Sequence, residues 1–315
     1  MNNMSDHDSL KSRAEIYFDA LINSTGVEGL PKPVSRGDEY LLALIAKLTE
    51  TNMFIENIES TLTETILSIE NIDSVLSGLS WIPAVTPEAH RNIFRGKNLG
   101  TVITPEQKQA ISSGTFDDLF IGDYWTINGT VYVIADMNYW LNTGDTSFNK
   151  QHLVMVTRTN MYNHAMNDEN TTTGGYVGSK MYTEGLNQAK TTIQGAFGEM
   201  LLTHRDYLIN AVSGGYPSAG AWFDSTVELM NEIMVYGSHI YTPGSTGSLT
   251  PTRYTINKQQ LALYNLDPKS VNNRQYFWLR DIVTSATFAY VNLYGGAYRY
   301  AASTSYGVRP VFAIG

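Results

Sequence analysis

A heptad pattern of apolar residues governs the stretch between residues 41 and 80. Leucine or isoleucine stands at every seventh position, and a second series follows three residues behind the first. The first series is Leu41, Leu48, Ile55, Leu62, Ile69 and Leu76, and the second is Leu44, Thr51, Ile58, Thr65, Ile72 and Leu79. Such an a/d ladder over about six heptads predicts a coiled coil. Because leucine and isoleucine are mixed at both positions, three or more strands are favoured, and we expect a trimeric stalk over residues 41–80.

Two copies of a helix-start pattern precede this ladder. Residues 12–22 align without gaps on residues 35–45, and each copy begins with serine and has an acidic residue three positions later. The pattern is a capping box, which predicts two helices, and the glycines and prolines of residues 26–33 separate them. Either the capping pattern occurs twice by chance, or the repeat is a docking peptide. In the second interpretation residues 1–40 bind equivalent sites on a larger assembly.

Residues 81–118 are predicted to form a connector after the stalk. Thr104 and Pro105 mark the start of a short helix, as its N-cap and its first residue, and Gly114 marks its end. The connector also holds a small basic cluster, which we expect to pair with the acidic stalk or with a neighbouring subunit. The cluster lacks the glycine pattern of a phosphate-binding loop. It consists of Arg91, Arg95 and Lys97.

Short apolar runs from residue 119 onward predict strands. Residues 119–127 and 130–135 flank an Asn-Gly pair, which is a strong signal for a β-hairpin. We expect an α+β head over residues 119–315, in which the first and last strands pair. Further strands are predicted at residues 152–157, 227–230, 277–280, 288–292, 297–301 and 308–314, and helices at 181–200 and 201–212.

The segment between residues 285 and 303 has an unusual composition. Tyrosines stand on a background of serine, threonine, glycine and alanine, and little in the segment is typical of a core. Rigid aromatic side chains on such a background are typical of a recognition surface. An antiparallel sheet with one solvated face would show the same composition.

Charge and composition exclude several classes of partner. The 315 residues carry a formal net charge of −9, and only 16% of them are charged. Without a basic surface, neither nucleic acid nor an anionic membrane is an expected partner. The chain has no cysteine, so disulfides, thiolate nucleophiles and cysteine-based zinc sites are excluded. No apolar leader and no run of 18 apolar residues is present, so we expect neither classical secretion nor membrane insertion.

Several motifs together resemble a family of bacteriophage virion proteins. This family has a C-type-lectin-like head and is related to phage tropism determinants and to the variable proteins of diversity-generating retroelements. The resemblance covers nearly the whole chain, and the N-terminal repeat is similar to docking segments of phage fibre and baseplate proteins. The pair WLR…GVRP at its end is the most diagnostic part. The motifs are NIFRGKNLG from Asn92, GTF from Gly114, GDYW from Gly122, LMNE from Leu229, FWLR from Phe277 and GVRP from Gly307.

The resemblance implies which side chains contact a ligand. In that family the segment between the last two motifs displays its contacting residues on a rigid sheet. Carried over to this sequence, the contacts are Ser285, Thr287, Tyr290, Asn292, Tyr294, Tyr298, Tyr300 and Ser303. We therefore expect a homotrimeric fibre or baseplate adhesin on the virion, assembled in the host cytoplasm. It would attach to other virion proteins through residues 1–45 and bind a host cell-surface glycan or protein.

The motifs of known catalytic centres are missing from the chain. Its six histidines are scattered, and no zinc-protease, P-loop, nucleophile-elbow or dinucleotide-binding motif occurs. His152 with Asp136 or Asp145 suggests a dyad, but a polar residue at a strand edge explains it better. Lectin-like enzymes of the formylglycine-generating type resemble the same fold but rely on cysteines or metal-ligand clusters. We therefore expect neither an enzyme nor a cofactor.

Other polar residues of the head are expected to be structural. Trp278 should lie in the core, while Arg280 or Arg309 binds loop carbonyls. Asp224 and Glu228 are expected to form a capping or solvated pair. One acidic and amide cluster offers oxygen ligands of the kind that Ca²⁺ prefers, but without a recognisable spacing. This cluster is Asn163, Asn167, Asp168, Glu169 and Asn170.

Two functional hypotheses of different classes remain open from the sequence. The first is the adhesin described above. The second is a structural decoration of the capsid, collar or neck, a head fibre whose head only spreads over or stabilises the particle. A depolymerase is disfavoured, because no pair of carboxylates or nucleophile constellation stands out.

Overall fold

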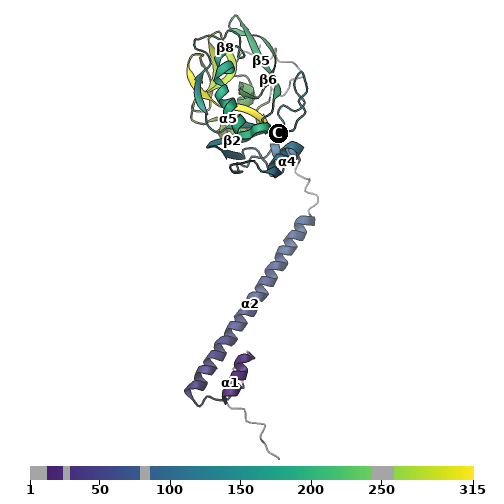
Figure 1. Cartoon of the computed structure of the whole chain (residues 1–315), viewed down its shortest axis with the longest axis vertical. Helices are drawn as coiled ribbons and strands as arrows, with labels where there is room; N and C mark the ends of the chain where they lie inside the picture. The colour runs from purple at the N-terminus through teal and green to yellow at the C-terminus, as the bar shows by residue number, and fades with distance from the viewer. Residues whose placement is uncertain (1–12, 24–28, 79–85, 243–258) are drawn as a thin grey trace, which may run out of the picture. The chain divides into compact units, whose positions relative to one another are not determined.

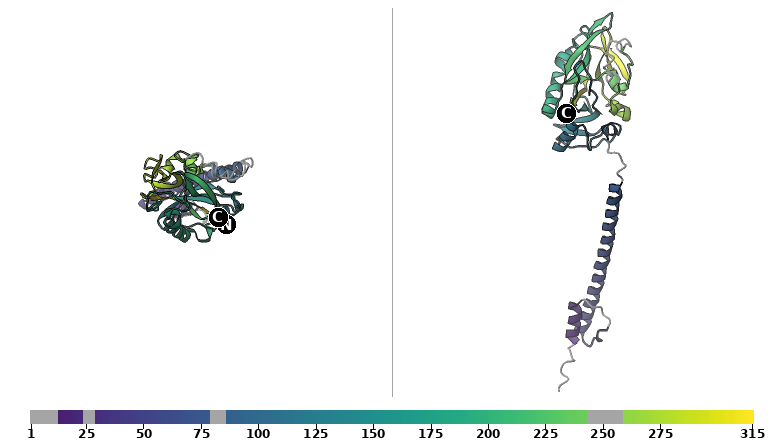
Figure 2. Two further views of the ribbon diagram at one scale, coloured as in Figure 1. Left: turned by 90° about the horizontal axis from the view of Figure 1, so that it is seen from above. Right: turned by 90° about the vertical axis from the view of Figure 1, so that its right-hand side faces the viewer.

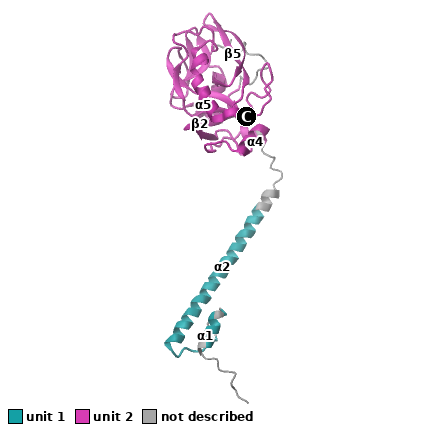
Figure 3. Cartoon of the chain, viewed as in Figure 1, with its two compact units in different colours: residues 1–83 teal, residues 84–315 magenta. Residues whose placement is uncertain are grey.

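The computed structural model describes residues 13–23, 29–78, 86–242 and 259–315. The chain divides into two compact units, residues 1–83 and residues 84–315 (Figure 3). The prediction of a mixed chain with a long N-terminal helix is confirmed (Figure 1). The two units are described separately below.

The first unit consists of two helices, α1 (Arg13–Ile22) and α2 (Arg36–Gly78). At the start of α2 the Asp38 backbone N–H donates to Ser35 Oγ at 3.2 Å, and Asp38 Oδ2 accepts from the Val34 N–H at 3.1 Å. These bonds satisfy N–H groups that the helix leaves without partners. The capping prediction is therefore confirmed for the second copy, while Ser12 of the first copy lies outside the described residues.

The two copies of the repeat pack against each other instead of presenting the same face. Tyr17, Ala20 and Ile45 form a small core between α1 and α2, and the Tyr17 hydroxyl donates to the Pro31 carbonyl. Tyr17 is fully buried, whereas Tyr40, its counterpart in the alignment, is 70% exposed. Equivalent residues of the two copies therefore have different environments, and docking on a larger assembly stays a prediction.

Beyond residue 45, α2 continues with its apolar ladder open to solvent. The a and d residues from Leu44 onward are between 37% and 60% exposed wherever their side chains are described and apolar. Leu41 instead packs beside the small core with α1, and Leu79 lies outside the described residues. Within one chain the ladder therefore has no partner among the described residues. The exposed members are Leu44, Leu48, Ile55, Ile58, Leu62, Ile69 and Ile72.

The second unit contains two five-stranded sheets and a separate hairpin, and Figure 2 gives two further views of it. The first sheet has the order β1 (Tyr124–Ile127), β2 (Thr130–Met137), β3 (Leu153–Thr157), β12 (Pro310–Ile314), β7 (Val227–Leu229). The second sheet has the order β10 (Ala297–Ala301), β9 (Thr287–Val291), β8 (Phe277–Thr284), β11 (Ser305–Val308), β4 (Tyr162–Ala165). The hairpin consists of β5 (His204–Ser213) and β6 (Tyr216–Ser225).

Short helices complete this unit. They are α3 (Pro87–Arg91), α4 (Pro105–Ser113), η1 (Met181–Gly185), α5 (Asn187–Phe197), η2 (Gly198–Met200), α6 (Glu232–Tyr236), α8 (Ala262–Leu266) and η4 (Pro268–Val271). The largest core takes residues from both five-stranded sheets, including Phe277 of β8 and Phe312 of β12. No helix in the described ranges is both long and apolar enough to cross a membrane.

The predicted hairpin is confirmed, but the first and last strands do not pair. Asn128 and Gly129 join β1 to β2 with positive φ angles of 49° and 81°, as a two-residue hairpin turn requires. The last strand, β12, instead lies between β3 and β7. All five residues of β3 and of β12 are buried, so both strands suit the middle of the sheet, whereas β1 is a four-residue edge strand.

Residues 201–212 form a strand and not the predicted helix. In β5 the residues His204, Asp206 and Leu208 are buried, and the residues between them are partly exposed. This alternation has the two-residue period of a strand. A Gly-Gly pair at residues 214 and 215 then turns the chain into β6, with which β5 pairs along its length. The helix predicted at residues 181–200 is present in three pieces, η1, α5 and η2.

The segment expected as a connector belongs to the head. The Arg95 N–H donates to the Ile121 carbonyl, and the Tyr124 N–H donates to the Lys97 carbonyl, both at 2.9 Å. Residues before 119 therefore add backbone pairs beside β1, and the compact unit begins at residue 84. The capping box at Thr104 and the left-handed Gly114 at the end of α4 are confirmed.

The basic cluster of this segment is neutralised inside the head. Arg91 binds Asp136 through two bonds of 2.5 and 2.9 Å, and Arg95 binds Asp123. Lys97 binds Asp118 at 2.8 Å. The expectation that this cluster pairs with the stalk or a neighbouring subunit is therefore wrong.

The two closing motifs bring the two sheets together. The Gly307 N–H donates to the Tyr276 carbonyl at 2.9 Å, where β11 runs parallel to β8. Within three residues the chain leaves the second sheet and enters the first as β12. The buried guanidinium of Arg309 fixes this crossing by donating to the carbonyls of Thr157 at 2.9 Å and Ser270 at 3.0 Å. Arg309 binds backbone carbonyls as predicted, but these belong to the end of β3 and to η4 and not to loops.

Replacing Gly307 by alanine is expected to lower the free energy of unfolding of the head by about 2 kcal/mol. A Cβ at this position would lie 1.8 Å from Asn160 Nδ2 and 2.7 Å from the Tyr276 carbonyl oxygen. The matched control is Gly195→Ala on α5, where nothing lies within 4 Å of the added Cβ. That change should raise helix propensity and stability slightly. Urea unfolding of the two variants measures the difference, and equal stabilities would contradict the crossing geometry.

Candidate binding surface

Six tyrosines on and beside the second sheet form a continuous cluster of rings, which we call the tyrosine face. They are Tyr241, Tyr276, Tyr290, Tyr298, Tyr300 and Tyr306. Tyr298 on β10 is the Cα partner of Tyr290 on β9, which in turn is the partner of Trp278 on β8. Residues paired directly across strands point to the same side of a sheet, so one row of aromatic side chains crosses three strands.

The rings of the tyrosine face touch one another from end to end. Tyr241 meets Tyr298 at 5.4 Å between ring centroids, and Tyr298 meets Tyr290 at 5.9 Å. Tyr290 meets Tyr306 at 4.8 Å, and Tyr306 stacks on Tyr276 at 5.0 Å with 20° between the ring planes. Such aromatic pairs hold each other in fixed orientations. The face is therefore preorganised for a ligand that packs on rings.

Exposure differs among these tyrosines and corrects one predicted contact. Tyr298 and Tyr300 are 49% and 46% exposed, and Tyr276 is 38% exposed. Tyr290 is only 6% exposed, because rings of its neighbours cover it, and burial raises the pKa of its hydroxyl to about 12. Tyr290 therefore packs under the other rings of the tyrosine face. The expectation that it contacts a ligand directly is wrong.

The remaining predicted contacts lie at the two ends of β9. Asn292 and Tyr294 belong to the turn from β9 to β10, where Asn292 Oδ1 accepts from the N–H groups of Tyr294 and Gly296 at 2.9 and 3.0 Å. Asn292 therefore shapes the turn, while Tyr294, 80% exposed, stands at its tip. Tyr294 has no ring contact with the tyrosine face among those found in the described residues.

Three predicted contacts gather at the opposite end of β9. Ser285 is exposed in the turn between β8 and β9, and Thr287 Oγ1 lies 2.7 Å from Thr284 Oγ1. Ser303 Oγ donates to Asn170 Oδ1 at 2.7 Å. At about 3.3 Å per residue, β9 keeps this end roughly 16 Å from the Asn292 turn. The eight predicted residues therefore do not form one patch, and only Tyr298 and Tyr300 lie on the tyrosine face as exposed contacts.

Three members of the tyrosine face were missed by the sequence reasoning. Tyr276 lies just before β8, Tyr306 lies in β11, and Tyr241 follows α6. Tyr276 and Tyr306 directly precede the two closing motifs, FWLR and GVRP. Residues two positions apart on a strand point to the same side. This rule would have placed Tyr276 with the buried Trp278, and Tyr306 with the buried Val308. For Tyr241 the sequence offers no such signal, because its position depends on tertiary packing.

Buried polar contacts attach neighbouring elements to β8. The Arg280 guanidinium on β8 binds the Asp206 carboxylate on β5 at 2.6 Å, and both side chains are buried. The Trp278 indole N–H donates to the His164 carbonyl at 3.0 Å, and Trp278 is fully buried, as predicted. These contacts attach the β5–β6 hairpin and β4 to β8. The tyrosine face therefore rests on a rigid support.

Glu228 is also buried and is not the solvated residue expected from the sequence. Its Oε2 accepts from the Tyr176 hydroxyl at 2.8 Å, and its Oε1 lies 3.1 Å from Ser225 Oγ. Burial raises the pKa of the Glu228 carboxyl to about 7, a shift that Arg280 opposes and Asp206 reinforces. Its predicted companion Asp224 instead binds Arg205 at the surface.

Replacing Glu228 by glutamine is expected to change how stability depends on pH. The folded pKa of about 7 exceeds the ordinary glutamate pKa of 4.5, so the stabilisation from protonated Glu228 is full below pH 4.5 and is lost as pH rises through 7. Relative to wild type, Glu228→Gln should therefore gain on the order of 3 kcal/mol between pH 4.5 and pH 8. Urea unfolding at both pH values measures this.

A control isolates the Glu228 effect from other titrating groups. Burial lowers the pKa of His152 and of His204 to about 4, so their contribution to stability falls as pH drops from 6.5. The wild type and Glu228→Gln share both histidines, and their difference removes this opposing trend. Glu199→Gln, at an exposed side chain, serves as the matched carboxylate-to-amide change. A pH-independent difference between wild type and Glu228→Gln would contradict the buried environment.

The described residues show no constellation for metal binding, since no group of three or more His, Asp or Glu side chains is placed to hold an ion. Two members of the acidic and amide cluster are already engaged with Lys180. Asn167 Oδ1 accepts from the Lys180 N–H at 2.8 Å, and Asp168 binds the Lys180 ammonium at 2.6 Å. The suggested dyad is not formed either, because His152 bonds the Lys150 carbonyl and the Trp140 N–H.

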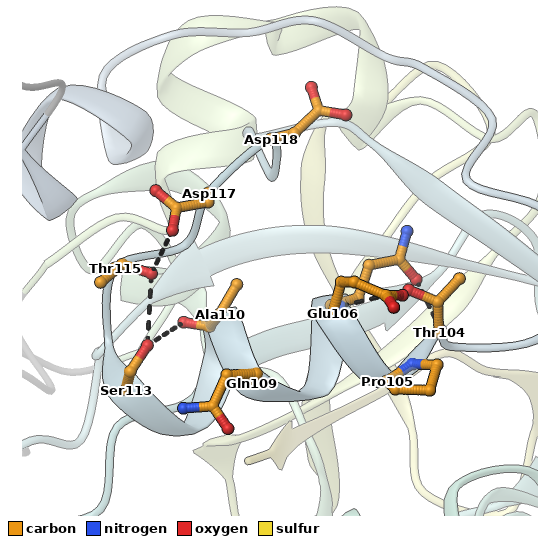
Figure 4. A pocket seen from close by; sticks show the side chains of 10 residues that line it. Thr104, Pro105, Glu106, Gln109, Ala110, Ser113, Thr115, Asp117 and Asp118 are labelled. Carbon is orange, nitrogen blue, oxygen red and sulfur yellow. Dashed lines mark hydrogen bonds between the residues drawn. The ribbon is translucent and has the colours of Figure 1, made fainter.

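An open hollow of about 770 Å³ lies beside α4 (Figure 4). It is formed by the helix and the turn that follows it, from Thr104 to Asp118. Ser113 Oγ donates to the Ala110 carbonyl at 3.3 Å, and Thr115 Oγ1 donates to Asp117 Oδ2 at 2.8 Å. The polar groups at this end are thus engaged with one another, and the hollow has no convergent set of side chains.

Comparisons with known proteins identify no relative of the chain. The chain matches no protein-family model, and no curated protein or solved structure is significantly similar to it.

Proposed function

We propose that the chain is a fibre-type adhesin of a bacteriophage particle that binds a host-surface ligand through the tyrosine face. The observation that carries the proposal is the continuous tyrosine face, with partly exposed rings on a rigid sheet. Tyrosine presents large, rigid, amphipathic area at low conformational cost. Sugars pack the C–H side of their rings on such surfaces, and protein ligands pack apolar side chains there, so both remain candidates.

The exposed ladder of α2 supports a multivalent arrangement. Apolar residues at a and d positions are 37% to 60% exposed in the single chain, and parallel association of three chains would bury them. Ile66 and Phe54 stand beside the ladder at e and g positions and are 48% and 66% exposed. Three heads on one stalk would strengthen weak single-site binding, commonly by about 10²–10⁴-fold. We therefore propose a homotrimeric stalk that carries lectin-like heads.

The N-terminal helix pair offers the surface for attachment to the particle. Phe18 on α1 is 57% exposed, and Tyr40 in the first turns of α2 is 70% exposed. Exposed aromatic side chains of this kind are common at protein interfaces. We propose that residues 1–45 bind other virion proteins through this pair of helices.

The same observation favours a second candidate function, the decoration protein of the capsid, collar or neck. Attachment through the helix pair requires no ligand at the head. The experiment that separates the two functions uses fluorescently labelled full-length protein on a panel of bacterial cells. Saturable binding to a subset of hosts is expected for the adhesin. Absence of binding to the cells that the particle infects would favour decoration.

A further inference from the structure

A second concave surface of the head lies apart from the tyrosine face and has a different chemistry. We call it the basic groove; its volume is about 560 Å³, within the range of small-ligand sites. Its walls come from the turn after β3, from the segment before β1 and from η4 with the loop that follows. None of the six tyrosines lines it. The residues that matter below are Phe94, Arg158, Asp267, Lys269, Arg274 and Arg309.

Arg95 in the lining of the basic groove is paired with Asp118 and Asp123, but the other cations of the lining are not neutralised by carboxylates. Arg158, Lys269 and Arg274 are exposed, and within the described ranges none of them forms an ion pair. The buried Arg309 binds carbonyl oxygens only, through three bonds of 2.9 to 3.2 Å. Asp267 is the single carboxylate in the lining, and its Oδ2 accepts from Ser270 Oγ at 2.7 Å. In a chain with net charge −9, this concentration of cations creates a local field that attracts anions.

Two of these cations are held in place by their surroundings. The Arg158 guanidinium lies 4.0 Å from the centroid of the Tyr124 ring. Arg274 has a φ of 58°, a conformation that costs free energy for a residue with a side chain. Its N–H donates to Asn272 Oδ1 at 2.8 Å, and the Gln275 N–H donates to Asn273 Oδ1 at 3.0 Å. The loop is therefore fixed in a strained shape that places Arg274 at the groove.

An aromatic ring forms part of the wall. Phe94 is 44% exposed, and its ring lies directly against the backbone of Gly122, where an added Cβ would be 2.2 Å from the ring. Gly122 also has a φ of 85°, which favours glycine. The absence of a side chain at residue 122 therefore allows the Phe94 ring to pack against the backbone in the wall of the basic groove.

We propose that the basic groove binds an acidic saccharide, a sugar chain whose rings carry carboxylate or phosphate groups. The unpaired guanidinium and ammonium groups would bind the anionic oxygens by charge-assisted hydrogen bonds. The Phe94 ring would pack against the C–H face of a neighbouring sugar. A site of pure charge would not need this ring, and a site for neutral sugars would not need the cations.

Isothermal titration of the full-length protein with three tetrasaccharide-sized probes tests the proposal. Tetragalacturonate carries carboxylates, a mannose oligosaccharide phosphate carries phosphate, and maltotetraose is neutral. Binding of either acidic probe, and not of maltotetraose, is expected, and the preferred probe identifies the anion. Hexaglutamate tests the alternative of an acidic peptide. Equal affinity for hexaglutamate and the acidic sugars, or no binding of either acidic sugar at millimolar concentration, would overturn the proposal.

Matched variants locate the binding. Arg158→Gln combined with Lys269→Gln should weaken acidic-sugar binding by about 100-fold, since each lost charge-assisted contact is worth roughly tenfold. The control combines Lys108→Gln with Lys150→Gln, which removes the same charge at exposed positions outside the groove. Phe94→Ala should weaken the acidic sugars and leave any hexaglutamate binding unchanged. Equal losses in the groove and control variants would overturn the proposal, and melting temperatures establish that each variant is folded.

The outcome is independent of the proposed adhesin function. Substitutions in the tyrosine face leave all lining residues of the basic groove in place. A protein that loses cell binding on substitution of Tyr298 and Tyr300, but retains acidic-sugar binding, has two sites. If the groove variants lose both cell binding and acidic-sugar binding, while the tyrosine-face variants lose neither, the basic groove is the single binding site.

Discussion

Replacing Ile58 and Leu62 by aspartate is expected to convert the proposed trimer into a monomer. Both side chains are more than 50% exposed in the single chain and lie at successive d and a positions of α2. In a trimer the two changes would bury six carboxylates, each at a cost of several kcal/mol. Sedimentation equilibrium should give three times the 35.0 kDa chain mass for the wild type and 35.0 kDa for the variant.

The control places the same charges on the other side of the helix. Ser60→Asp with Leu67→Asp alters two exposed f positions of the same heptads, which a coiled coil leaves in water. This variant should remain trimeric. The stalk proposal fails if the Ile58 and Leu62 variant keeps its mass, or if the wild type is itself a monomer at micromolar concentration.

Replacing Tyr298 and Tyr300 by alanine is expected to abolish binding to host cells. Truncation of a central aromatic contact commonly costs about 2 kcal/mol or more, so the pair should lower single-site affinity by roughly 10³-fold. Both rings are partly exposed on the edge strand β10, whose backbone pairing with β9 does not depend on them. Binding of labelled protein to cells, measured over a range of concentrations, gives the change in affinity.

Two other exposed tyrosines provide the control for this prediction. Tyr216 on β6 is 56% exposed and Tyr40 on α2 is 70% exposed, and neither belongs to the tyrosine face. Their combined replacement by alanine should leave cell binding unchanged. Unaltered binding of the Tyr298 and Tyr300 variant would show that the tyrosine face is not the contact surface, provided that both variants have the melting temperature of the wild type.

Much of the secondary structure was accessible from local sequence patterns. The ladder from Leu44 to Ile72 lies on one long helix, and Asn128-Gly129 forms the expected turn, because both signals depend on neighbouring residues alone. The capping box at Thr104 was predictable for the same reason. The strand β5 was missed because its apolar residues also fit a helical spacing, and only the buried alternation of His204, Asp206 and Leu208 decides between the two.

The candidate site was only partly predictable, because its composition is set by strand pairing. Tyr298 and Tyr300 lie two residues apart on one strand and share a side, as a sequence can show. The burial of Tyr290 depends on Tyr276, just before β8, and on Tyr306 in β11, and local patterns do not place β11 beside β8. Glu228 was expected in solvent because its bond to Tyr176 joins residues 52 positions apart.

The most direct test of the adhesin proposal is competition for adsorption. Host cells are incubated with saturating full-length protein, and the rate at which the particle that carries this chain adsorbs to them is then measured. The proposal predicts that the wild-type protein blocks adsorption and that the Tyr298 and Tyr300 double variant does not. Adsorption at an unchanged rate in the presence of saturating wild-type protein would contradict the proposal.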